Sequence, residues 1–151
     1  MSDQLPEPLT LTRTVAASRQ QVWDAWTKPE QFAEWFAPET FTVPEIEADP
    51  QIGGKLYLEM EDSNGVRYPM SGIYQVVDEP EKLVMINSPL DAEGKALFEI
   101  EQSVTLAEAD GQTTMTVTNK VLSATQDAAP YLAGMKEGLT QSLNKLEKLL
   151  Q

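Results

Sequence analysis

Apolar side chains between Val43 and Asn119 recur at every second position, and this alternation constrains the fold more than any other feature of the chain. A period of two places apolar residues on one face of a strand and polar residues on the other. Turn signals interrupt the alternation at the spacing of an antiparallel meander. They are Gly53-Gly54, Asn64-Gly65, Glu79-Pro80-Glu81, residues 91–94 and Asp110-Gly111. With the alternating segment Leu9–Val15 added, the sequence predicts an antiparallel sheet of about seven strands that has one covered face.

The same alternation predicts which side chains lie on the covered face. They are Leu56, Leu58, Met60, Tyr68, Met70, Gly72, Tyr74, Val76, Phe98, Ile100, Val104, Leu106, Met115 and Val117. Two amides share this face, because Gln102 interrupts its apolar row and Asn119 ends the row of Met115. Burying an unpaired amide costs about 1–3 kcal/mol, so each amide needs a partner. Either amide orients a ligand, or it bonds to neighbouring backbone or lies at a solvated strand end. We favour the second explanation and keep the first.

Helical signals follow the first predicted strand. Ser18 stands at an N-cap position with Gln21 three residues later, which is the capping-box spacing. We therefore expect a helix that ends near Thr27. Pro29 fits the first turn of a second short helix that extends to about Phe36.

The segment from Gln126 to Gln151 changes to a helical period. Its leucines and Met135 recur at spacings of three and four residues, so we expect one long amphipathic helix. Gly134 and Gly138 lie inside it, although each glycine costs a helix about 1 kcal/mol against alanine. We interpret the two glycines as allowing close approach of the sheet, with space for a guest molecule as the alternative.

Charge and hydropathy limit the partners and the location of the protein. The chain has 24 acidic and 11 basic residues, and its net charge of −13 repels nucleic acid and anionic lipid. No apolar run approaches the roughly 18 residues that span a bilayer, and residues 1–8 do not resemble a signal peptide. We expect a cytoplasmic protein without a nucleic-acid or membrane partner. Residues 1–8 are expected to be flexible, and residues 9–151 to form a single domain.

The chain contains no histidine and no cysteine, which removes several enzyme classes. Serine–histidine and cysteine–histidine catalysis, zinc sites of thiolate or imidazole, and iron–sulfur clusters each lose an essential group. An all-oxygen metal site could use Glu59, Glu61, Asp62 and Asn64, but Asp62–Gly65 fits a tight hairpin turn better than a calcium loop. The carboxylates on the predicted strands alternate onto the outer face. We therefore expect no metal, no cofactor and no catalytic residue.

Several motifs resemble one known superfamily. Residues 17–30 (ASRQQVWDAWTKPE), Trp35-Phe36 and Gly53-Gly54 are similar to the opening of the SRPBCC, or START-like, superfamily. They resemble the branch named for the activator of the heat-shock-protein-ninety ATPase, and residues 68–74 (YPMSGIY) and 134–139 (GMKEGL) match its later motifs. The resemblance covers the chain past Thr10. It implies an α+β helix-grip fold, in which a curved antiparallel sheet wraps round the C-terminal helix and two short helices follow the first strand.

The resemblance also implies a cavity between sheet and helix that takes a hydrophobic ligand. Methionines on the predicted inner faces support this, because methionine adapts to irregular apolar guests, although we favour ordinary core packing as the explanation of any single one. Our first hypothesis is a module that binds a small hydrophobic or amphipathic molecule. The candidate cavity residues are Trp26, Met60, Met70, Tyr74, Met85, Phe98, Gln102, Met115, Leu132, Met135 and Leu139.

Two alternatives follow from the same resemblance. The branch name suggests a co-chaperone-like protein that interacts with a heat-shock ATPase. Polyketide cyclases share the fold, so an enzyme is the third hypothesis. The enzyme ranks last, because no carboxylate is predicted on the inner face and histidine is absent.

Overall fold

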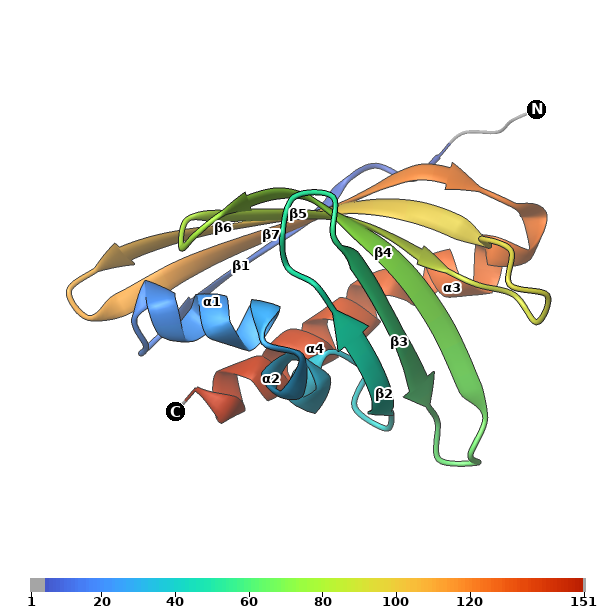
Figure 1. The fold of residues 1–151 in the computed structure, drawn as a ribbon, viewed down its shortest axis with the longest axis horizontal. Coiled ribbons are helices and arrows are strands. Elements are labelled where there is room, and N and C mark those ends of the chain that lie inside the picture. The colour runs from blue at the N-terminus through green and yellow to red at the C-terminus, as the bar shows by residue number, and fades with distance from the viewer. Residues whose placement is uncertain (1–4, 151) are drawn as a thin grey trace.

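A computed structural model describes residues 5–150 of the chain. Within these residues, seven strands form one curved antiparallel sheet in the order β1-β7-β6-β5-β4-β3-β2 (Figure 1). The number and the pairing of the strands confirm the predicted sheet. The strands are β1 (Leu9–Val15), β2 (Thr42–Ala48), β3 (Lys55–Glu61), β4 (Arg67–Asp78), β5 (Lys82–Pro89), β6 (Phe98–Ala109) and β7 (Gln112–Ala124).

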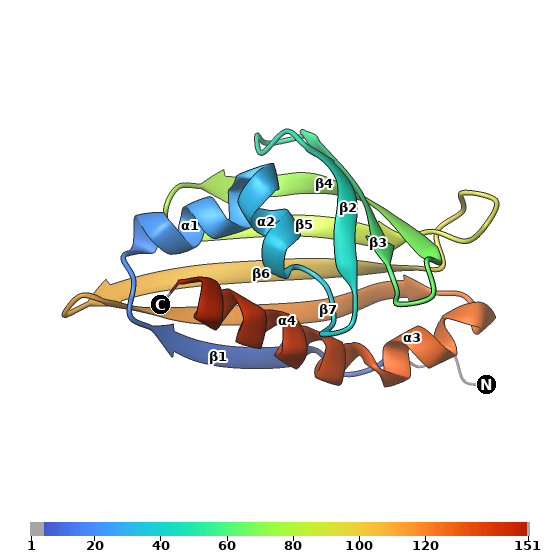
Figure 2. The same ribbon diagram turned by 90° about the horizontal axis from the view of Figure 1, so that it is seen from below.

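The helices lie on the concave side of the sheet (Figure 1). Seen from below, α4 runs along the β7–β1 side of the sheet and contacts β1 and α2 (Figure 2). Helix α1 contacts β6 and β7, and α2 contacts β2. This arrangement confirms the α+β helix-grip fold. The helices are α1 (Arg19–Thr27), α2 (Pro29–Trp35), a single 3-10 turn (Gln126–Ala128), α3 (Ala129–Ala133) and α4 (Met135–Leu149).

The start of α1 is the capping box that the sequence predicts. Ser18 Oγ accepts the N–H of Gln21 at 3.2 Å, and Gln21 Oε1 accepts the N–H of Ser18 at 2.9 Å. Pro29 begins α2, where its missing N–H has no effect because an N–H at the first helical position has no partner within the helix. Trp26 and Trp35 then meet edge to face, with ring centroids 4.6 Å apart. The two short helices are therefore fastened to each other and to the sheet by buried rings.

The C-terminal helix differs from the prediction, because it is broken at Gly134 rather than continuous from Gln126. Gly134 ends α3 and also precedes α4, with φ −95° and ψ 1°. Glycine has little helix propensity, which favours a break at this residue. Beyond the break, Leu139, Leu143 and Leu146 are buried against the sheet. The leucine period of α4 is thus correct, whereas the single helix was wrong.

One side chain of β4 was assigned to the wrong face. The pairing of β4 with β5 shifts register between Tyr74 and Val76, which marks a β-bulge. The extra residue turns Val76 outward, where it is 36% exposed, and Val77 packs against the core in its place. Strict alternation cannot anticipate this change, because the bulge depends on how β4 pairs with its neighbour.

The β3–β4 connection is the tight turn predicted from Asp62–Gly65. Gly65 has a φ of +81°, and its N–H donates to the carbonyl of Asp62. Asp62 Oδ1 accepts the N–H groups of Asn64 and Val66, each at 2.9 Å. Across residues 5–150, no cluster of acidic side chains is arranged to hold a metal ion. None of the helices in that range combines the length and the apolar character that a bilayer crossing requires.

Candidate ligand-binding pocket

A pocket of 460 Å³ lies where the ends of β3–β6 meet the α3–α4 junction and the loop between α2 and β2. This volume falls within the usual range of small-molecule sites. Its lining is almost entirely apolar, and we call it the apolar pocket. The lining residues are Pro38, Phe41, Met60, Tyr68, Pro69, Met70, Pro89, Phe98, Pro130, Tyr131, Gly134, Met135 and Gly138.

A smaller hollow of 140 Å³ adjoins the apolar pocket. The two share Pro38, Met60, Met135 and Gly138, so they lie on either side of the same side chains. We call the smaller one the amide pocket, because it is lined by Gln102 and Asn119. Its other lining residues are Phe36, Ala37, Leu139 and Ser142.

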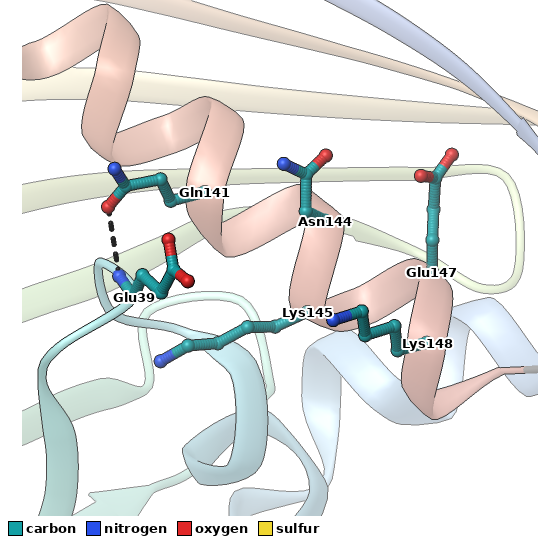
Figure 3. Close-up of a pocket in the computed structure, with 6 residues that line it drawn as sticks. All are labelled: Glu39, Gln141, Asn144, Lys145, Glu147 and Lys148. Carbon is teal, nitrogen blue, oxygen red and sulfur yellow. Dashed lines mark hydrogen bonds between the residues drawn. The ribbon is translucent and has the colours of Figure 1, made fainter.

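The loop between α2 and β2 forms one wall of both pockets and is bonded to α4. Lys145 Nζ donates to the carbonyls of Pro38 at 2.9 Å and Phe41 at 3.1 Å. Gln141 Oε1 accepts the N–H of Glu39 at 2.9 Å (Figure 3). Burial lowers the pKa of Lys145, an effect that the carboxylate of Glu39 opposes. These bonds fix Pro38 and Phe41 at the pocket wall.

The surface of α4 beside this loop is hollowed but polar. Figure 3 shows the hollow, which measures 340 Å³. Its charges make it a poor site for an apolar guest. The residues lining it are Glu39, Gln141, Asn144, Lys145, Glu147 and Lys148.

The two helical glycines leave space rather than allow close packing. A methyl group at Gly134 would come no closer than 3.9 Å to a neighbouring atom, the carbonyl oxygen of Pro130. At Gly138 it would lie 3.6 Å from Pro38 Cγ, an ordinary contact. Both glycines line the apolar pocket. Close approach of the sheet was therefore the wrong explanation, and the alternative of open space fits the geometry.

The two inner-face amides bond to each other across neighbouring strands. Gln102 and Asn119 are directly opposite in the register of β6 and β7, and Gln102 Nε2 donates to Asn119 Oδ1 at 2.9 Å. Gln102 is 3% exposed and Asn119 is 5% exposed. Among the described residues, no group donates to Gln102 Oε1. The backbone bond or solvated strand end that we favoured does not account for these side chains.

The candidate cavity residues fall into separate groups. Met60, Met70, Phe98 and Met135 line the apolar pocket. Gln102 and Leu139 line the amide pocket. Trp26, Tyr74, Met85 and Met115 lie in the closed core at no more than 1% exposure and line neither pocket. Leu132 lines a separate surface hollow beside the end of β7.

Several lining residues were missed by sequence reasoning. Pro38 and Phe41 belong to a loop whose place on α4 depends on the distant residues Gln141 and Lys145. Tyr131 reaches the pocket from α3, whose break from α4 the leucine period does not reveal. Tyr68 carried a usable signal, because it lies on the predicted inner face next to Met70.

An acidic hollow of 530 Å³ adjoins the apolar pocket and shares Tyr68, Pro69 and Tyr131 with it. Arg67, which lines this hollow, bonds to Glu61 at 3.0 Å and to Glu59 at 3.1 Å. Hydrogen bonds from Tyr57 and then from Arg67 lower the pKa of Glu59. The hollow is lined by Glu59, Arg67, Tyr68, Pro69, Leu90, Asp91, Ala92, Leu97, Asp127 and Tyr131.

The lining of the two pockets suits the binding of an apolar molecule rather than acid–base catalysis. Among the residues that the structure describes, neither a carboxylate nor a lysine nor an arginine lines the apolar pocket or the amide pocket. A hydrogen bond to Asp62, at 3.0 Å, raises the pKa of the Tyr68 hydroxyl above its ordinary value, which already lies well above neutral pH. The two pockets can hold an apolar body and offer amide groups at one end.

The sequence and the fold of this chain are similar to those of known proteins. A family model described as "Activator of Hsp90 ATPase homolog 1-like protein" matches residues 16–151. No curated protein matches the chain. A solved structure from Nitrosomonas europaea is 25% identical, with a TM-score of 0.80 over 95% of this chain and 93% of its own.

Two further solved structures share the fold. A protein from Chromobacterium violaceum is 24% identical, with a TM-score of 0.84, and the match covers 97% of this chain and 98% of that one. A protein from Staphylococcus epidermidis is 26% identical, with a TM-score of 0.73, and the match covers 99% and 93%. The fold is therefore shared along nearly the whole length of each chain.

Proposed function

The chain belongs to the family of Activator of Hsp90 ATPase homolog 1-like proteins, and from that premise we propose that it binds a small hydrophobic or amphipathic molecule. The match confirms the resemblance read from residues 17–30, 68–74 and 134–139. The observation that carries the proposal is the 460 Å³ apolar pocket between the sheet and the C-terminal helices.

The composition of the pocket wall supports binding by burial. Pro38, Pro69, Pro89 and Pro130 have restricted backbones, which lowers the entropy lost when a guest is held. The facing methionines adjust to the shape of the guest. A guest that buries about 200 Å² of apolar surface gains roughly 5 kcal/mol before the cost of association is subtracted. Without that cost, about 5 kcal/mol corresponds to a dissociation constant of about 0.2 mM, so millimolar or weaker affinity is the corresponding expectation.

Methionine methyl groups provide a direct test. Met60, Met70 and Met135 line the apolar pocket, whereas Met85 and Met115 lie in the closed core and serve as internal controls. Protein labelled with ¹³C at the methionine methyls is titrated with naphthalene, 2-naphthol, decan-1-ol and cholesterol. We expect saturable shifts of the three pocket methyls and much smaller shifts of the two core methyls. If no probe moves the pocket methyls, the proposal is wrong.

Interaction with a chaperone is the second candidate function, and the description of the matched family is the observation that favours it. Such an interaction would use an outer surface, and Glu99 and Glu101 alternate outward along β6 between buried residues. The test is the ATPase rate of an Hsp90-class chaperone with and without this protein. A rate that is unchanged at saturating protein would remove this candidate and leave ligand binding untouched.

A further inference from the structure

We propose, on the basis of the binding function above, that the ligand carries a neutral hydrogen-bond donor, a hydroxyl or an N–H group, that binds Gln102 Oε1. Its apolar body would occupy the apolar pocket, and its donor would reach the amide pocket. The proposal thus names the chemical class of the ligand.

The first observation is the unpaired oxygen of Gln102. Its side chain is 3% exposed and lines the amide pocket. The Nε2 group is held by Asn119 Oδ1 at 2.9 Å, and no group among residues 5–150 donates to Oε1. Folding removes the hydrogen bond that this carbonyl makes with water in the unfolded chain, and leaving it without a partner costs free energy. A ligand donor that bonds to the carbonyl would replace the lost bond.

The arrangement of the amide pair selects a donor rather than an acceptor. Asn119 Oδ1 already accepts from Gln102 Nε2, so among residues 5–150 the oxygen of Gln102 is the atom of this pair that is left without a partner. A ligand carbonyl or ether at this place would face an oxygen lone pair. Asn87 also has an unpaired side-chain oxygen, but that oxygen lies over Gly72, and Asn87 lines neither pocket. Gln102 is therefore the residue that discriminates between ligands.

The charges around the site select a neutral ligand. Within residues 5–150, no cation lines the apolar pocket or the amide pocket, so a ligand carboxylate would be desolvated without a counterion. The adjoining acidic hollow carries Glu59, Asp91 and Asp127 against Arg67, which is already bonded to Glu59 and Glu61. With a net charge of −13, the protein repels anions before they reach the pocket.

A set of matched probes tests the proposal. 2-Naphthol donates a hydrogen bond, 2-methylnaphthalene has nearly the same shape without a polar group, 2-methoxynaphthalene can only accept, and 2-naphthoate is an anion. Dissociation constants at pH 7 are measured from the methyl signals of Met60 and Met135. We expect 2-naphthol to bind about fivefold more tightly than 2-methoxynaphthalene, because one net hydrogen bond distinguishes them. 2-Naphthoate should bind most weakly.

The variant Gln102→Leu separates the hydrogen bond from hydrophobicity. The ratio of the affinities of 2-naphthol and 2-methylnaphthalene should fall about fivefold in the variant, while 2-methylnaphthalene itself binds at least as well. Lys136→Ala, on the exposed side of α4, is the control and should leave the ratio unchanged. If Gln102→Leu does not fold, the ranking of the probes on the unaltered protein decides.

The possible outcomes separate this proposal from the binding function. If all four probes move the pocket methyls with similar affinity, the pocket binds and the donor requirement is wrong. Tighter binding of 2-methoxynaphthalene or 2-naphthoate than of 2-naphthol overturns the requirement as well, and so does an unchanged ratio in Gln102→Leu. If none of the probes shifts the pocket methyls, the binding function fails, and this proposal fails with it.

Discussion

Replacing Gly138 by alanine should stabilise the protein and weaken ligand binding at the same time. Gly138 lies within α4 and lines both the apolar pocket and the amide pocket. An added Cβ would lie 3.6 Å from Pro38 Cγ, which is ordinary van der Waals contact and requires no movement. The helix should gain about 1 kcal/mol, the difference between the two residues in a helix interior.

This gain corresponds to a rise of about 2–4 °C in the melting temperature of a domain of this size. The added methyl group projects into the space shared by both pockets, so the affinity for 2-naphthol should fall. Thermal and urea unfolding measure the stability, and the methionine methyl titration measures the affinity. Lys136→Ala, also on α4 but outside both pockets, is the matched control for affinity.

The stability and the affinity of Gly138→Ala can each contradict this prediction. A loss of more than about 1 kcal/mol in the free energy of unfolding would mean that Gly138 is needed for close packing. Unchanged affinity together with increased stability would mean that the ligand does not use this part of the pocket.

Two further predictions concern the core and the loop. Burial and then the charge of Asp49 raise the pKa of Tyr74 to about 12. The folded protein therefore holds this proton more tightly than the unfolded chain, whose tyrosines titrate near pH 10. The contribution of Tyr74 to the free energy of unfolding should be fully present below pH 10 and should decrease as the pH rises towards 12. Urea unfolding should show that Tyr74→Phe loses about 1 kcal/mol less between pH 9 and 11 than the unaltered protein, and equal losses would contradict the assignment. Lys145→Met should cost about 1–3 kcal/mol in the free energy of unfolding, because the carbonyls of Pro38 and Phe41 lose their donor. The methyl signals of Met60 and Met135 should shift even without ligand, whereas unchanged signals would show that the loop does not depend on Lys145.

Local signals account for most of the fold. The capping box of Ser18 and Gln21 and the position of Pro29 are contacts within a few residues, so the sequence displays them directly. The strands follow from alternation because one face of the sheet is covered. Val76 was misplaced because a bulge depends on pairing between β4 and β5. The break at Gly134 was missed because the leucine period continues on both sides of it.

The site was less predictable than the fold. Alternation places Met60 and Met115 equally on the inner face, yet Met60 lines both pockets and Met115 is sealed beside Trp26. The difference depends on which helix or loop covers each position, and this is settled by contacts between distant parts of the chain. The bond between Gln102 and Asn119 follows from strand register, which the hydrophobic pattern and the Asp110-Gly111 turn set together.

Gly134, at the α3–α4 junction, and Gly138, in α4, allow the volume of the apolar pocket to change independently of the sheet. Both of them face the pockets from α3–α4, while the paired strands on the opposite side keep their hydrogen bonds whatever side chain stands on the helix. A single substitution at Gly134 or Gly138 therefore resizes the chamber without altering a strand. Pocket volume can thus change at these two positions while the backbone of the fold is retained.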